Sequence, residues 1–179
     1  YFYFRLIQPV INRAFNRQRL DLRKLGVQFV GEIAYLKNID QLIGEFEEVL
    51  SQGLGIKYVD VYLKGGEAGV YGNIRGETVL IDADVEEWFI GANHLAERNM
   101  VAGNPYYDAI RERFLALYER FDCVYIVPLV EAGAGTVGLV LMGEKANLRQ
   151  LSAHEVAFIN NIRSAATIAV VNSLMFKNL

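Results

Sequence analysis

The chain has 179 residues, of which 53% are hydrophobic and 22% charged, values typical of a globular domain and not of a largely disordered chain. The only cysteine, Cys123, excludes an internal disulfide and a zinc site of four cysteines, and it fits a reducing compartment. The net charge of −3 is unevenly distributed, because residues 1–24 carry six basic side chains and one acidic side chain, which leaves the remainder acidic.

The N-terminal segment combines aromatic and basic residues. It opens with Tyr1-Phe2-Tyr3-Phe4-Arg5, a pattern typical of the cytoplasmic end of a membrane-spanning helix. No apolar run reaches the ~18–20 residues that cross a bilayer. We expect residues 5–24 to contact an anionic membrane surface, and no nucleic acid, in a membrane-anchored parent protein on the cytoplasmic side of the inner membrane. The alternatives are a solvated helix face and aromatic residues that belong to the core.

Two helices are predicted in the first third of the chain. Pro9 suits the first turn of the first helix, and apolar residues then recur at three- and four-residue steps to about Leu36. Asn38 with Gln41 three residues later is a capping signal for the second helix, which we expect to end near Gly53 and Gly55.

The next segment alternates strictly between two kinds of side chain and predicts a strand over residues 57–63. One face, which we expect to look toward a helical layer, carries Val59, Val61 and Leu63, and the opposite face carries Tyr58, Asp60 and Tyr62. Residues 69–73 and 77–82 predict two further strands. Residues 84–121 are expected to be mostly helical, with a new helix starting at Asn104-Pro105.

Two strands over residues 123–130 and 136–143 are apolar on both faces, so both sides of the sheet should be covered there. Residues 133–138 match the dinucleotide fingerprint G-x-G-x-x-G, but a strand follows the glycines, and no helix end is available to hold a phosphate. We interpret them as a hairpin turn. Ser152 and Glu155 predict a capping box that opens a long helix reaching about Phe176.

A set of short motifs follows in order along the second half of the chain: Val127-Pro128-Leu129, Gly138-Leu139-Val140-Leu141, Glu144-Lys145, Ser152 and Asn172. This set resembles that of GAF domains, small sensory modules of signalling proteins, and the resemblance covers about residues 38–175. It implies an α+β fold with a GAF-like central antiparallel sheet, helices on both faces, and an N-terminal helical arm. We therefore divide the chain into a basic juxtamembrane helical arm, residues 1–37, and a GAF-like domain, residues 38–179. The arm resembles the juxtamembrane region of bacterial membrane-anchored sensors.

The specialised kinds of GAF domain find no support in the sequence. The Asn-Lys-Phe-Asp-Glu signature of the cyclic-nucleotide-binding members is absent. Bilin-binding relatives carry a cysteine directly before a histidine, whereas His94 follows Asn93. Relatives that reduce free methionine sulfoxide need more than one reactive cysteine. The resemblance therefore implies a generic sensory domain whose cofactor, if it has one, is unknown.

An aromatic set forms the best candidate for a ligand site, because an aromatic cavity with a few polar groups is the usual make-up of a small-molecule site. The alternative is a core packed with the same rings. An inward-facing Asp60 would need a partner, since an unpaired buried carboxylate is costly. No catalytic or metal-binding residues are assigned, because neither a catalytic triad nor the spacing of a calcium loop can be found. The candidate ligand-binding residues are Tyr58, Asp60, Tyr62, Trp88, Phe89, His94 and Tyr107.

These observations predict a non-catalytic sensory or regulatory domain of a bacterial, histidine-kinase-like signalling protein. It would relay a small-molecule or membrane-side signal through its terminal helices, which pair in a homodimer, to an output domain. The alternative is a ligand-free GAF-like scaffold for dimerisation or interaction. A third hypothesis, a small redox or hydrolytic enzyme, would use Cys123 or His94, and we expect no turnover.

Overall fold

The computed structural model describes residues 21–36 and 38–177. In this part of the chain six strands form one antiparallel sheet in the order β3-β2-β1-β6-β5-β4, which confirms the predicted antiparallel sheet. The hairpin of β5 and β6 lies near the centre, and β1 pairs with β6 along five residue pairs. The strands are β1 (Val59–Lys64), β2 (Val70–Gly72), β3 (Thr78–Leu80), β4 (Ala96–Glu97), β5 (Tyr125–Glu131) and β6 (Gly135–Met142).

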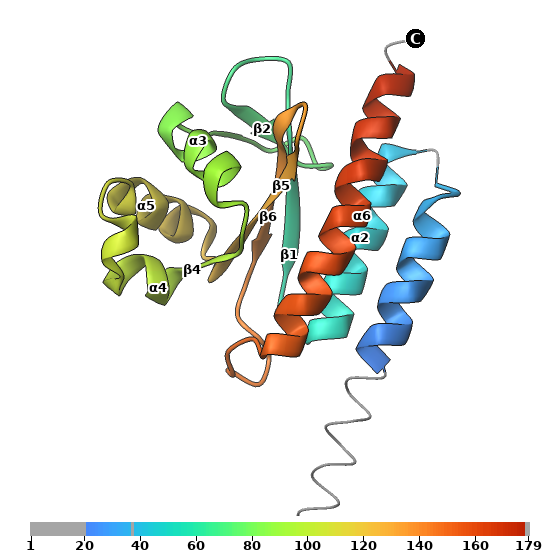
Figure 1. The fold of residues 1–179 in the computed structure, drawn as a ribbon, viewed down its shortest axis with the longest axis horizontal. Helices are drawn as coiled ribbons and strands as arrows, with labels where there is room; N and C mark the ends of the chain where they lie inside the picture. The colour runs from blue at the N-terminus through green and yellow to red at the C-terminus, as the bar shows by residue number, and fades with distance from the viewer. Residues whose placement is uncertain (1–20, 37, 178–179) are drawn as a thin grey trace, which may run out of the picture.

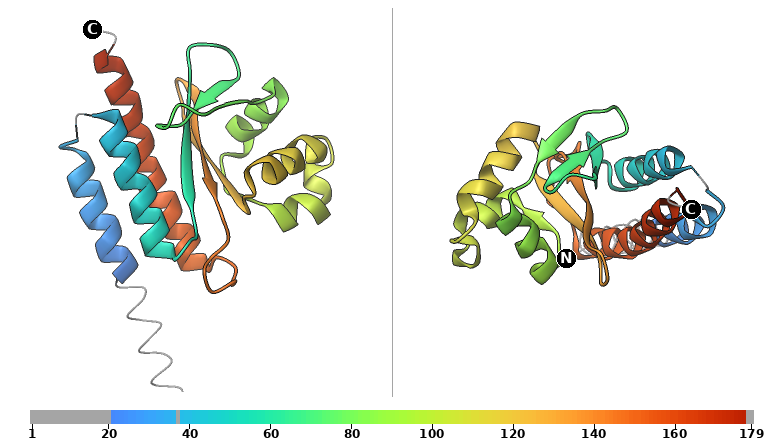
Figure 2. Two further views of the ribbon diagram at one scale, coloured as in Figure 1. Left: turned by 180° about the vertical axis from the view of Figure 1, so that it is seen from behind. Right: turned by 90° about the horizontal axis from the view of Figure 1, so that it is seen from above.

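Helices cover both faces of the sheet (Figure 1). One face carries α2 (Ile39–Leu54), α6 (Ala153–Lys177) and the N-terminal helix, whose described part is residues 21–33. The view from above in Figure 2 separates these three from the helices of the other face. The other face carries α3 (Ala83–Ala92), α4 (Arg98–Gly103), the 3-10 helix η1 (Pro105–Tyr107) and α5 (Arg111–Phe121). The predicted α+β class is therefore confirmed.

Local signals fix the ends of the two long helices. The Asn38 side chain accepts a hydrogen bond from the Asp40 N–H at 2.8 Å, and Gly55 ends α2 in the left-handed region with φ 65°. At α6, Ser152 Oγ accepts the Glu155 N–H at 3.2 Å, while Glu155 Oε1 accepts the Ser152 N–H at 3.0 Å. This reciprocal pair is the predicted capping box.

The glycine-rich segment is the turn of the β5–β6 hairpin, as predicted. The Glu131 carboxylate accepts the N–H groups of Gly133 and Ala134, each at 2.8 Å, and Gly135 adopts φ 72°. A positive φ is easy for glycine and strained for other residues. The turn leads directly into β6, so no helix N-terminus faces these glycines.

Two hydrophobic cores lie on opposite faces of the sheet. The helical-layer core joins the N-terminal helix, α2 and α6 to Val61, Val127 and Val140 of the sheet. The aromatic core lies under α3, α4 and α5 and is built around Tyr62, Tyr71, Phe89, Phe114 and Tyr118. The sides of β1 are therefore as predicted, with Val61 in the first core and Tyr62 in the second.

The segment under the aromatic core differs from its prediction. Asn104-Pro105 opens only the three-residue η1, and α5 begins after Ile110, whose φ of −125° and ψ of −1° interrupt the helix. The two-residue strand β4 is too short to leave a periodic pattern. Among the described residues no helix combines the length and apolarity needed to cross a membrane. The opening aromatic residues and the basic residues as far as Arg19 lie outside the described part of the chain.

Candidate functional site

The seven candidate ligand-binding residues all lie on the aromatic side of the sheet or at its rim, in two groups. Trp88, Phe89 and Tyr107 pack in the aromatic core with His94 beside them. The second group consists of Asp60 and Tyr62 of β1 and of Tyr58, which directly precedes this strand, and it lines a separate cavity. The structure therefore does not bring all seven into one site.

The first group is a cluster of rings packed on one another. The ring of Trp88 lies 5.0 Å from that of Phe114, 5.2 Å from Tyr107 and 5.4 Å from His94, measured between centroids. Phe89 and Tyr107 are buried, whereas His94 is exposed, with Nδ1 2.9 Å from the Leu95 carbonyl oxygen. The rings fill this part of the aromatic side by contact with one another.

The second group opens onto a cavity of about 490 Å³. Tyr62 of β1 and Tyr58 just before it form one wall, and Phe121 at the end of α5 forms another, with its ring 5.4 Å from that of Tyr62. The Tyr58 hydroxyl donates to the Phe121 carbonyl oxygen at 2.5 Å. This bond ties the end of α5 to β1. The remaining residues that line the cavity are Val59, Asp60, Arg75, Glu77, Arg120 and Leu141.

A polar network occupies one side of this cavity. The buried Asp60 carboxylate accepts from Arg75 Nη2 at 2.8 Å and from Asn73 Nδ2 at 3.2 Å. Asn73 Nδ2 also lies 3.0 Å from Glu77 Oε2, and Asn73 Oδ1 accepts the backbone N–H groups of Arg75 and Glu77. Asn73 therefore holds the loop between β2 and β3 next to Asp60. With Arg75 beside it, Asp60 has the positively charged partner that a buried carboxylate needs.

The tyrosine hydroxyls of the cavity remain protonated at neutral pH. Burial, with the nearby Asp60 as the next cause, raises the pKa of Tyr62 to about 12. Burial also raises the pKa of Tyr58. Both hydroxyls can therefore donate hydrogen bonds, and the Tyr62 hydroxyl lies 3.4 Å from Glu77.

A side chain of α2 connects the cavity strand to the helical layer. The strand β1 pairs with β2 only at Leu63 and Lys64, which leaves its earlier part without a partner on that side. Glu47 of α2 accepts the Val61 N–H there at 3.0 Å. Burial raises the pKa of this half-buried carboxyl, and the charge of Asp60 adds to the effect. This contact is made by Val61, the residue directly after Asp60.

A second connection runs from α6 to the far edge of the sheet. Arg163 donates to the Pro128 carbonyl oxygen of β5 at 3.0 Å and to the Asn93 carbonyl oxygen, just after α3, at 2.8 Å. Burial lowers the pKa of Arg163. Its guanidinium thus covers the part of β5 that β4 does not reach and joins α6 to the segment that follows α3.

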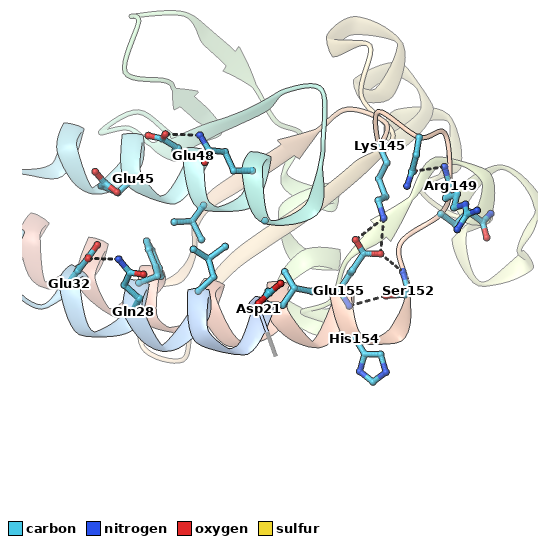
Figure 3. A pocket seen from close by; sticks show the side chains of 18 residues that line it. Asp21, Gln28, Glu32, Glu45, Glu48, Lys145, Arg149, Ser152, His154 and Glu155 are labelled. Carbon is cyan, nitrogen blue, oxygen red and sulfur yellow. Dashed lines mark hydrogen bonds and ion pairs between the residues drawn. The ribbon is translucent and has the colours of Figure 1, made fainter. Parts of the chain in front are cut away.

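The helical side of the molecule also carries a groove of about 860 Å³, between the N-terminal helix, α2 and the loop before α6 (Figure 3). Carboxylates of both helices, Glu32, Glu45 and Glu48, gather toward one end. At the other end Lys145 pairs with Glu155 at 2.7 Å, and both side chains are nearly buried. The carboxylates of the first end are exposed, so the groove is an open junction between helices.

Neither the cysteine nor a cluster of metal-ligating side chains supports a catalytic role in the described part of the chain. Cys123 is buried, and burial raises its pKa to about 12, so that it is a neutral thiol at physiological pH. Within residues 21–36 and 38–177 no three His, Cys, Asp or Glu side chains converge as metal ligands.

Sequence reasoning missed several residues that complete the site, because their partners lie elsewhere in the chain. Asn73, Arg75 and Glu77 belong to a short turn, and only the expectation that Asp60 needs a partner pointed toward them. Glu47 and Arg163 lie on helices with ordinary amphipathic patterns. No local signal distinguishes them from solvated charges.

Comparisons with known proteins agree on the fold. No protein-family model matches the sequence, and no curated protein matches it. The GAF domain of a phosphoenolpyruvate-protein phosphotransferase from Coxiella burnetii superposes with a TM-score of 0.62, at 12% identity over 90% of this chain and 99% of that one.

Two further solved structures show how widely this fold is used. The GAF domain of a potassium sensor histidine kinase from Escherichia coli gives a TM-score of 0.53, at 14% identity over 86% of this chain and 96% of that one. A free methionine-R-sulfoxide reductase from Neisseria meningitidis gives 0.58, at 14% identity over 86% of this chain and 90% of that one. The neighbours thus include parts of signalling proteins and an enzyme. The described residues have the fold of GAF domains, as the sequence predicted.

Proposed function

We propose that this chain is a non-catalytic sensory or regulatory GAF domain that relays a signal through its terminal helices to an output domain. The observation that carries the proposal is the arrangement of the helical layer. The N-terminal helix and α6 run in the same direction on one face of the sheet (Figure 1). The N-terminal helix therefore enters the layer at the end where α6 begins, and α6 leads out at the opposite end. A shift of one against the other would be transmitted along the length of the layer.

The three helices meet closely enough for such coupling. Phe158 of α6 lies against Gly26 of the N-terminal helix and Gly53 of α2, where an added Cβ atom would stand 3.4 Å from its ring in both cases. At Gly53 that Cβ would also approach Leu25 Cδ2 to 2.8 Å. An alanine at Gly53 would therefore require the end of the Leu25 side chain to shift within this tightly packed contact.

The signal reaches this layer from the opposite face of the sheet. A molecule that binds over β1 changes the surroundings of Asp60, and Glu47 carries the change to α2. Arg163 supplies a second path, from the segment after α3 to α6. The GAF domain of a sensor histidine kinase among the structural neighbours supports a signalling role of this kind.

The wider setting of the proposal is a homodimeric, histidine-kinase-like protein anchored at the cytoplasmic side of the inner membrane, with residues 5–24 near anionic lipid. Both terminal helices carry exposed apolar side chains that suit a dimer contact: Val27, Val30, Ile168 and Met175. Exposed apolar side chains of this kind, when they gather, mark interaction surfaces.

The oligomeric state tests this arrangement. At tens of micromolar, light scattering coupled to gel filtration should give the mass of a dimer. The double variant Ile168→Glu, Met175→Glu should give a monomer, because two buried charges per subunit are not tolerated at such a contact. The control is Leu80→Glu on β3, which is also exposed and should remain dimeric. A monomeric wild-type chain would contradict the relay through paired helices.

The filled ring cluster around Trp88 favours a second candidate, a GAF-like scaffold that dimerises without a ligand. Native mass spectrometry of the purified chain separates the two. A small molecule that co-purifies supports sensing, and a dimer that carries nothing and responds to no added compound supports the scaffold.

A further inference from the structure

We propose that the cavity over β1 binds the cationic group of a small organic molecule, an ammonium or a guanidinium, at Asp60, and that Arg75 leaves Asp60 as the ligand enters. The inference rests on the proposed sensory function and specifies the chemical class that the site would sense.

The fixed part of the site is the carboxylate of Asp60. Its side chain is only 12% exposed, and Asn73 Nδ2 holds it at 3.2 Å from within the protein. A carboxylate in such a position is costly without a cation beside it. An anionic or neutral ligand that displaced Arg75 would leave Asp60 without one, so the site selects a positive charge.

The exchangeable part of the site is Arg75. Its side chain is 57% exposed and belongs to the turn between β2 and β3, and its guanidinium pairs with Asp60 at 2.8 Å and Glu77 at 3.6 Å. An ion pair with so exposed a partner contributes little to stability. The guanidinium is therefore an internal stand-in for a ligand cation, and its departure into solvent is easy.

The walls of the cavity suit the same class of ligand. The faces of aromatic rings attract cations, and Tyr58, Tyr62 and Phe121 line the space next to Asp60. The guanidinium of Arg120 already lies over the Phe121 ring, 5.5 Å from its centroid. Glu77 adds a second carboxylate. A volume of about 490 Å³ lies within the range of small-molecule sites.

The consequence for signalling follows from the position of Asp60 in β1. Its neighbour Val61 donates to Glu47 of α2. Replacing a guanidinium tethered to the loop by a free cation removes one of the two contacts that hold the loop between β2 and β3 to Asp60, while the Asn73 contact and the charge beside Asp60 are kept. The changed restraint on β1 would thus alter the contact between Val61 and Glu47 and so reach α2.

The test uses the purified full chain and three probes of similar size: n-butylammonium, butyrate and butanol. Two-dimensional amide NMR titrations follow the backbone N–H groups of residues 58–62 and 73–77. We expect n-butylammonium to shift these signals in a saturable manner, and the other two probes to leave them unchanged. Arg75→Gln, which removes the internal competitor, should tighten n-butylammonium binding by up to about fivefold, the factor that corresponds to an ion pair of about 1 kcal/mol.

Asp60→Asn should weaken n-butylammonium binding at least tenfold, and Asp84→Asn is its matched control, since Asp84 forms an exposed ion pair with Arg113 elsewhere. If Asp60→Asn does not fold, the effect of Arg75→Gln decides. Saturable shifts from butyrate, no shifts from n-butylammonium in the wild type and Arg75→Gln, or equal affinity in Asp60→Asn would each overturn the inference. The failure of the relay would be seen instead as a monomeric chain.

Discussion

The cores on the two faces of the sheet differ in their residue types and in the lengths of the helices that cover them. The helical-layer core consists mainly of aliphatic residues from long helices and the central strands, whereas the aromatic core lies under short helical segments and includes six buried Phe and Tyr rings. The buried Asp60–Asn73 contact and the cavity lie on the aromatic side, and the open groove lies on the helical side. Long, closely packed helices suit transmission, and short segments joined by loops suit a site that must admit a ligand.

The largest expected effect comes from removing one central ring from each core. Phe46→Ala in the helical-layer core and Phe114→Ala in the aromatic core should each lower the free energy of unfolding by about 3–5 kcal/mol, since both side chains are fully buried. Trp88 is the only tryptophan and contacts Phe114 at 5.0 Å. Its emission in the folded state should change in Phe114→Ala and not in Phe46→Ala. Urea unfolding gives the free energies, and equal emission changes would mean that the faces respond as one unit.

A smaller effect is expected from the contact that joins the two faces at the edge of the sheet. Arg163→Met keeps the aliphatic stem but leaves the carbonyl oxygens of Pro128 and Asn93 without their donor, which should cost about 1–3 kcal/mol. Hydrogen exchange should accelerate in residues 93–97. Arg149→Met, in the exposed loop before α6, is the control and should leave both quantities unchanged.

The difference between the faces also explains what the sequence could predict. The capping box at Ser152, the glycine turn at Gly135 and the alternation of Val61 and Tyr62 in β1 all depend on residues within a few positions of one another. Local patterns of this kind are legible in a single sequence. The structure confirms each of these three features.

The candidate site was only partly predictable, because its contacts join distant residues. Asp60 was recognised as needing a partner, but its pairing with Arg75 depends on the fold of the loop between β2 and β3. Arg163 and Asn93 lie 70 positions apart, and nothing local links them. A pattern of aromatic residues shows that rings face inward. It does not distinguish rings that fill a core, as around Trp88, from rings that line a cavity, as Tyr58 does.

Glycines in the helical layer provide a third and smaller effect. Gly31→Ala in the N-terminal helix should stabilise the chain by about 0.5–1 kcal/mol, because an added Cβ meets nothing within 4 Å and alanine favours a helix. Gly53→Ala in α2 makes the same chemical change, but its Cβ would displace the end of the Leu25 side chain, so it should stabilise the chain less than Gly31→Ala does. Thermal unfolding measures both. Equal stabilisation by both variants would show that the layer is looser than the relay requires.

The smallest expected effect is a change in pH dependence at the link between the two faces. The pKa of Glu47 is raised by burial, so the folded state binds its proton more tightly than the unfolded chain, where the pKa is about 4.3. The charged carboxylate therefore opposes folding above the raised pKa. This opposition is relieved as the pH falls through the raised value and is gone below about 4.3. Relative to Glu47→Gln, the wild type should gain stability across that window, as urea unfolding between pH 7 and 4 would reveal. Glu48→Gln, an exposed position on the same helix, should follow the wild type. If the Glu47→Gln and wild-type curves stay parallel, burial does not raise the pKa of Glu47 in the folded state.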